Sequence, residues 1–236
     1  MKNHCKLCLK EEILRKSHVV PEFLHRPVYD DYHRLTSFEP KKLRSTYRQS
    51  GLWDRLFCDG CEGRLSQLES YFANVWFKKP VRPDSLEGEM AVIINLDYVK
   101  FKLFHLSILW RAHVSDLNEF RELTLGQQAE NIRVRILTGD PGPSDVYPIS
   151  GMALRRTDGS FKDDLMLLPG YSKIENYHLY IMLFGGVFWL CGHSDHCGDC
   201  PPVPTNLKND GTLTLFIQDW MKNSSIQDLF RQMQKH

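Results

Sequence analysis

The sequence predicts an α+β fold, in which a metal-stabilised N-terminal part precedes a larger part of helices and antiparallel strands. Three observations lead to this prediction. Two Cys-x-x-Cys pairs lie in the first third of the chain, apolar residues recur at helical spacing through its middle, and runs of β-branched and aromatic residues follow. The proline-containing segment 79–84 separates the two parts, so we expect domains at 1–79 and 83–236.

Apolar periodicity places the helices. Apolar residues recur every three or four positions over 61–77 and again over 98–115, and each stretch predicts a helix. Thr124 is the expected N-cap of a third helix, which ends near Leu137. Aromatic residues at helical spacing are typical of a core, so we expect the whole of 98–115, including Arg111, to be scaffold.

The strands are expected after Pro143, where β-branched and aromatic residues become frequent. Gly185-Gly186 lies between two such runs and predicts the turn of a hairpin. Ser225, with Asp228 three residues later, predicts a capped amphipathic helix in the tail. The expected strands are 146–154, 178–184, 187–191 and 212–217.

The composition is that of a globular protein. The chain has 236 residues, 42% of them hydrophobic and 25% charged, which excludes collagen-like, coiled-coil and wholly disordered classes. The longest apolar run, 179–191, is interrupted by glycines and is shorter than the roughly 20 residues that cross a bilayer. We therefore expect no membrane partner. The start of the chain has no apolar signal region, and we expect a cytoplasmic protein.

The two cysteine pairs are the strongest signal in the sequence. Cys5 and Cys8 form one pair, and Cys58 and Cys61 form the other about 50 residues later. In a reducing compartment, two such pairs are typical of one tetrahedral Zn²⁺ site whose shell is closed, which makes the ion structural. A knuckle, an extended segment and a second knuckle at a helix N-terminus are the order of a treble clef.

A basic segment follows the first cysteine pair. Residues 1–82 hold 16 Lys/Arg and 10 Asp/Glu, although the whole chain has a net charge of only +1. Cations mixed with hydroxyl groups and a tyrosine suit a phosphate backbone, so DNA or RNA is the expected partner. The alternative is an ordinary solvated loop. The candidate phosphate contacts are Lys41, Lys42, Arg44 and Arg48.

Ser17-His18-Val19-Val20-Pro21 follows the first knuckle. Here the chain resembles the HNH, or His-Me finger, endonucleases, whose ββα finger carries a catalytic histidine before an apolar pair and a proline. It is also similar to small, uncharacterised bacterial proteins with Cys-x-x-Cys, Ser-His-x-x-Pro-x-Phe and Cys-x-x-Cys-Glu motifs. The resemblance covers about 1–76, with a weaker Ser-x-x-Trp-Arg likeness at 106–113.

The resemblance implies a metal-dependent endonuclease or nickase, for instance in bacterial or phage defence. His18 would be the general base that activates water, and Glu62 with Glu69 would hold a catalytic Mg²⁺ or Mn²⁺. Two positions depart from the family. Ser17 stands where the family usually has an acidic residue or histidine, and Glu62 stands where it commonly has histidine or asparagine.

These departures keep a second interpretation open. His18 could be a structural residue of the finger, and the protein would then be a non-catalytic zinc module that binds nucleic acid or a protein partner. The two interpretations predict different effects of replacing His18. A nuclease would lose turnover, whereas a binding module would be unaffected. The neighbouring histidines, His25 and His33, are expected at the surface.

A second cluster of cysteines and histidines lies near the C-terminus. Any four of its members could surround a second Zn²⁺, although ten residues make a cramped loop, so a ligand from elsewhere or from a partner subunit of a homo-oligomer could complete the shell. The alternatives are a reduced surface loop and, less favoured, a redox pair. The cluster consists of Cys191, His193, His196, Cys197 and Cys200.

Overall fold

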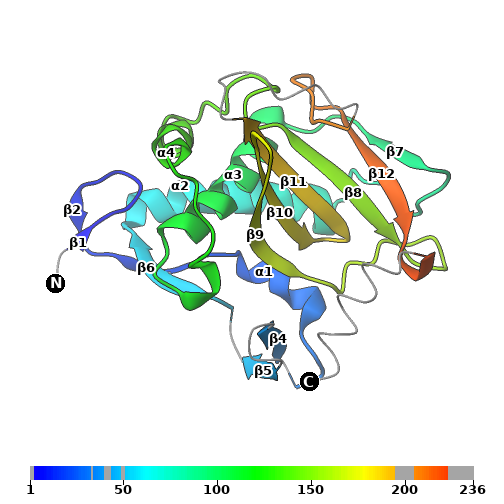
Figure 1. Ribbon diagram of the computed structural model, residues 1–236, viewed down its shortest axis with the longest axis horizontal. Coiled ribbons are helices and arrows are strands. Elements are labelled where there is room, and N and C mark those ends of the chain that lie inside the picture. Colours follow the sequence, from blue (N-terminus) through cyan, green and yellow to red (C-terminus); the bar gives the residue numbers. More distant parts are fainter. Residues whose placement is uncertain (1–2, 33, 40–43, 49–50, 195–204, 223–236) are drawn as a thin grey trace.

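The α+β fold predicted from the sequence is confirmed: a six-stranded sheet carries helices on one face, and the first third of the chain forms smaller strand pairs (Figure 1). The computed structural model describes residues 3–32, 34–39, 44–48, 51–194 and 205–222. In spatial order the large sheet contains β7 (Met90–Ile93), β12 (Leu213–Asp219), β8 (Ile149–Arg155), β11 (Val187–Ser194), β10 (Tyr177–Phe184) and β9 (Leu167–Ile174). Its neighbouring strands are antiparallel, except that β12 runs parallel to β8.

The N-terminal part consists of short strand pairs that lead into a long helix. A small knuckle comes first, and a longer strand pair then runs directly into α2, which gives the order strand, strand, helix. The pairs are β1 (Asn3–His4) with β2 (Glu11–Glu12), β3 (Arg15–His18) with β6 (Trp53–Phe57), and β4 (Leu35–Glu39) with β5 (Arg44–Arg48). The one-turn helix α1 (Glu22–His25) follows β3 and is continued by a 3-10 turn, Arg26–Val28.

The three helices predicted between residues 61 and 137 are present. They are α2 (Asp59–Ala73), which continues as a π-helical turn over Asn74–Lys78, α3 (Tyr98–Val114) and α4 (Gln128–Thr138). The last begins later than predicted, because the Thr124 hydroxyl accepts from the Gly126 amide and closes a turn before the helix. Two further 3-10 turns lie at Asn118–Phe120 and Trp220–Lys222.

The predicted hairpin is also confirmed. Gly185 and Gly186 have φ values of 60° and 76°, and they connect β10 to β11 by a two-residue turn that requires positive φ at both positions. The sequence did not predict β7 or β9. Both are edge strands, and β9 contains Pro169, which weakens a strand pattern but is tolerated at an edge.

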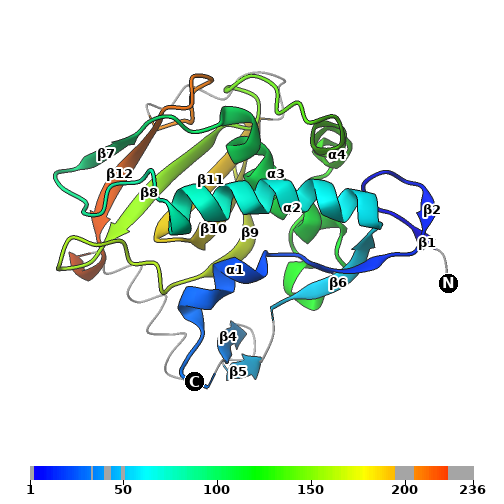
Figure 2. The same ribbon diagram turned by 180° about the vertical axis from the view of Figure 1, so that it is seen from behind.

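The core joins the helices to the large sheet. Helices α2 and α3 cover one face of the sheet (Figure 2), where Phe72 of α2 stacks on Phe104 of α3 with ring centroids 4.2 Å apart. Trp76 contacts Trp189 of β11 edge to face at 5.2 Å. One hydrophobic cluster contains buried residues from both sides of the predicted boundary at 79–83. The division into two domains stays a prediction.

Some predictions fall on residues that lie outside the described ones. These include the tail helix from Ser225 and most of the second cysteine cluster. Among the described residues, no helix is both long enough and apolar enough to cross a bilayer.

Candidate functional site

The fold brings the four N-terminal cysteines together. Cys5 and Cys8 lie in the loop of the β1–β2 knuckle, Cys58 is the last residue before α2, and Cys61 lies in its first turn. Their sulfur atoms are all within 4.8 Å of one another. The Sγ atoms of Cys8 and Cys58 are 3.8 Å apart, and the four thiols are not joined by disulfides.

This arrangement suits a tetrahedral ion. Four sulfurs at about 2.3 Å from a Zn²⁺ ion are separated from one another by about 3.8 Å. Burial and the neighbouring thiols raise the pKa of the Cys61 thiol, because a buried thiolate beside other sulfurs is costly without a cation. Among the described residues, these cysteines are the only group of three or more histidine, cysteine or acidic side chains close enough to share an ion.

His18 is the last residue of β3 and keeps about a third of its side chain exposed. Its Nε2 atom lies 3.4 Å from Oε2 of Glu22, the first residue of α1. The other oxygen of Glu22 accepts a hydrogen bond from the Tyr29 hydroxyl at 2.6 Å. Burial and this carboxylate raise the pKa of Tyr29 to about 12, so the phenol stays a donor. The carboxylate is thereby fixed beside the imidazole.

His25 lies beneath this pair and not at the surface, which corrects the expectation from the sequence. Its side chain is 2% exposed, and within the described part of the chain neither ring nitrogen has a hydrogen-bond partner. Burial lowers the pKa of His25, because a charged imidazole is costly away from water. The backbone approaches closely at Gly51, where a Cβ atom would lie 2.7 Å from Glu22 Oε2. His33 lies outside the described residues.

Glu62 contacts Ser17 and not His18. The Ser17 hydroxyl donates to Glu62 Oε1, and it is the buried neighbour of His18 in β3. Side chains alternate along a strand, so Ser17 points towards α2 while His18 points away from it. Burial raises the pKa of Glu62, and the Ser17 hydrogen bond opposes that effect.

Glu69 is paired with Arg111, which the sequence predicts only as part of the scaffold. The Arg111 side chain is 3% exposed, and its Nη1 atom donates to Glu69 Oε1 at 2.6 Å. The same atom donates to the backbone oxygen of His18 at 3.0 Å. Ser107 holds the guanidinium through its backbone oxygen and its hydroxyl. The Ser-x-x-Trp-Arg likeness was the signal that could have identified Arg111.

The second cysteine-histidine cluster is described only in part. Cys191 is buried in β11, and His193 follows two residues later in the same strand. The His193 ring stacks on His178 of β10, with centroids 4.4 Å apart and planes tilted by 12°. The other predicted ligands, His196, Cys197 and Cys200, lie outside the described residues, so the second Zn²⁺ stays a prediction.

The predicted phosphate contacts also stay predictions. Lys41 and Lys42 lie outside the described residues, while Arg44 and Arg48 are the first and last residues of β5.

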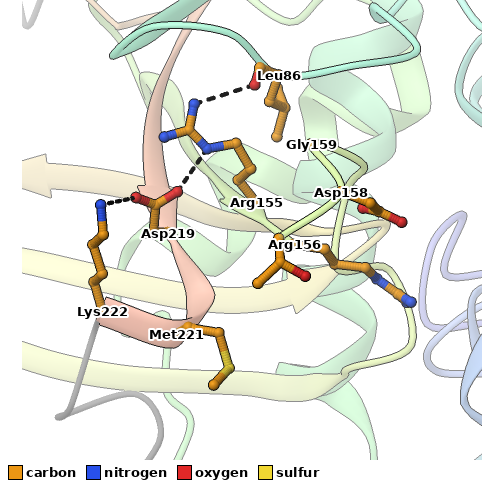
Figure 3. A pocket seen from close by; sticks show the side chains of 9 residues that line it. Leu86, Arg155, Arg156, Asp158, Gly159, Asp219, Met221 and Lys222 are labelled. Atoms are coloured by element: carbon orange, nitrogen blue, oxygen red, sulfur yellow. Dashed lines mark hydrogen bonds and ion pairs between the residues drawn. The ribbon is translucent and has the colours of Figure 1, made fainter.

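A surface cavity of about 490 Å³ lies elsewhere, and none of the predicted site residues lines it (Figure 3). Its cations are paired: Asp219 binds both Arg155 and Lys222, at 2.6 and 3.1 Å.

Comparison with protein-family models, with curated proteins and with solved structures finds no match to this chain.

Proposed function

We propose that the protein is a nuclease, an enzyme that hydrolyses phosphodiester bonds in nucleic acid, with His18 as the general base. The observation that carries this proposal is the pairing of a partly exposed imidazole with the fixed carboxylate of Glu22 at 3.4 Å. A carboxylate beside one ring nitrogen favours one orientation of the imidazole, and histidine is the side chain that most often accepts a proton in general base catalysis.

The surrounding framework supports the same proposal. A knuckle, a strand pair and a helix that begins between two cysteines are compatible with the order of a treble clef, and the four clustered thiols support a structural Zn²⁺ site. Zinc would hold the start of α2 against the knuckle, and the β3–β6 pair would present His18 at its end. The resemblance to HNH endonucleases implies a ββα finger, and the order of β3, β6 and α2 supports that part of the proposal.

The residues predicted to hold Mg²⁺ or Mn²⁺ do not fit that role as they are arranged. Glu62 accepts from Ser17, Glu69 is paired with Arg111, and neither belongs to a group of three converging ligands within the described residues. No step of the proposed reaction is assigned to such an ion. The chain itself supplies a base at His18, a carboxylate that orients it, and a metal-stabilised framework.

The test is a cleavage assay on supercoiled plasmid, single-stranded DNA and RNA, each with added Mg²⁺ or Mn²⁺. Wild type is compared with His18→Ala and with His178→Ala, a matched histidine in the large sheet, at equal zinc content. We expect His18→Ala alone to lose cleavage, by roughly 100-fold or more, as for removal of a general base. Equal cleavage by all three proteins would overturn the assignment of His18.

A second candidate function is a non-catalytic zinc module that binds nucleic acid or a protein. It is favoured by the Ser17–Glu62 and Arg111–Glu69 contacts, because they engage both carboxylates expected at a metal-dependent active site. Binding without cleavage, in a wild-type protein that retains its zinc, would favour this function over the nuclease.

A further inference from the structure

The β3–β6 pair has an outer face that combines cations with an aromatic ring. Lys16 pairs with Arg55 and His18 pairs with Trp53 across the two strands. Residues directly opposite one another share a face, and positions two apart along a strand share it too. Lys16, His18, Trp53 and Arg55 therefore form one surface, which we term the outer face.

The opposite side of the same strands is turned inward. Ser17 pairs with Asp54 there; the serine is 2% exposed and contacts α2, and the aspartate accepts from the Ser115 hydroxyl. Between Lys16 and His18 and between Trp53 and Arg55, the middle residue is less exposed than the residues on either side of it, which agrees with this assignment. The outer face is thus the solvent side of the finger.

Trp53 is exposed although it is large and aromatic. The residue is 40% exposed, and the ammonium group of Lys16 lies 3.9 Å from a ring centroid. A cation is attracted to the electron-rich face of an indole, so Lys16 lies over one face of the ring, and the exposed remainder of the Trp53 side chain is bordered by positive charge. Ring surfaces of this kind are where nucleobases stack.

Lys16 and Arg55 are the two cations of the outer face. Neither Lys16 nor Arg55 forms an ion pair within the part of the chain that the structure describes, whereas neighbouring Arg15 is paired with Asp59. Arg55 is held in place because its Nη1 atom donates to the backbone oxygen of Leu14 at 3.1 Å. Lys16 and Arg55 therefore bring positive charge to the exposed ring, while the carboxylate of Glu22 lies beside His18 at the other end of the face.

We propose that the outer face is a binding site for single-stranded nucleic acid, in which a base stacks on Trp53 while Lys16 and Arg55 contact phosphates. The proposal rests on the nucleic-acid substrate of the proposed function and specifies its class. Bases inside a duplex are already stacked on one another, so an exposed indole is available only to an unpaired base. His18 lies opposite Trp53, which brings the backbone of a stacked nucleotide to the proposed base.

Binding is measured by fluorescence anisotropy with labelled oligothymidylate and with a duplex of the same length, without Mg²⁺ or Mn²⁺, so that cleavage plays no part. We expect Trp53→Ala to weaken single-strand binding about 10-fold, as for loss of a stacked base, and Trp53→Phe to retain most of the affinity. Phe216→Ala is the matched control, because Phe216 is a 47% exposed aromatic residue of β12.

The cations are tested by salt dependence. Lys16→Ala and Arg55→Ala should each reduce the slope of log affinity against log salt by about 0.7, and Lys208→Ala, an exposed lysine near β12, should leave it unchanged. Every variant is first checked for wild-type zinc content and circular dichroism.

Three results would overturn the proposal. Equal affinity of wild type and Trp53→Ala, or equal losses for single strand and duplex, would reject the outer face while leaving the nuclease function open. If the wild-type protein binds neither nucleic acid, the outer face and the nucleic-acid substrate fail together. If single-strand binding depends on Trp53 but the protein does not cleave, the binding site on the outer face would be supported and only the nuclease function would be rejected.

Discussion

Arg111 Nη1 lies 2.6 Å from Glu69 Oε1 and 3.0 Å from the backbone oxygen of His18. Through this one buried guanidinium, α3 is joined to α2 and to the end of β3. The residue thus fixes the position of the strand that presents the proposed base, although it comes from the part of the chain beyond 83. The two predicted domains share this contact.

We expect Arg111→Met to lower the free energy of unfolding by about 3 kcal/mol, because removing one partner leaves a partly buried carboxylate and a carbonyl oxygen unpaired. Urea unfolding measures the loss. Lys100→Ala, which breaks the exposed pair with Asp97, is the control and should cost less than about 1 kcal/mol. A double-mutant cycle with Glu69→Gln should show strong coupling, and equal losses for Arg111 and Lys100 would contradict the buried role.

His105 should make the protein sensitive to acid. Its ring is fully buried among aromatic side chains, and burial lowers its pKa to about 3. The unfolded chain takes up a proton at this residue below about pH 6.5, while the folded chain does not until about pH 3. The stability that neutral His105 contributes is fully present above about pH 6.5 and is lost as the pH falls towards about pH 3.

Thermal unfolding from about pH 7 to about pH 4 tests this prediction with His105→Phe. The variant should lose less of its melting temperature with acid than wild type does. Parallel curves for the two proteins would show that His105 is protonated in the folded state. His25 and His113, whose pKa values burial also lowers, contribute in the same direction and remain in both proteins.

Removal of zinc should unfold the N-terminal part. Purified protein is expected to contain one Zn²⁺ at the four-cysteine group, and Cys61→Ser should lose it, because three thiolates bind the ion less tightly than four. Metal analysis and limited proteolysis after chelation measure the effect. Wild-type resistance to proteolysis after complete removal of the metal would show that the cluster does not stabilise the fold.

Gly51 should not tolerate a side chain. In Gly51→Ala the new methyl group would lie 2.7 Å from Glu22 Oε2 and 3.1 Å from the His25 ring, so we expect a loss of about 1 to 3 kcal/mol, as for overpacking. Gly63→Ala is the matched control. It lies in α2 with no atom within 4 Å of the added methyl, and it should gain about 1 kcal/mol from helix propensity. A neutral Gly51→Ala would show that Glu22 and His25 can move apart.

Local pattern was enough to predict α2, α3 and the β10–β11 hairpin, because helical periodicity and a Gly-Gly turn act over short stretches of chain. It was also enough to predict that the four cysteines form a group. It could not predict the partners of Glu62 and Glu69. The Glu62 contact depends on which side of β3 faces α2, and the Glu69 contact depends on a guanidinium 42 residues away in the sequence. Neither relationship produces a periodic pattern in the sequence. The burial of His25 was missed for the same reason.

The hydrogen bond from Trp76 Nε1 to the Gly185 oxygen joins residues 109 positions apart. During synthesis on a ribosome, α2 emerges long before the hairpin that covers its aromatic side. At about 5 to 20 residues per second, this side would stay uncovered for about 5 to 20 s. The nascent chain should therefore be a client of chaperones that bind exposed aromatic segments.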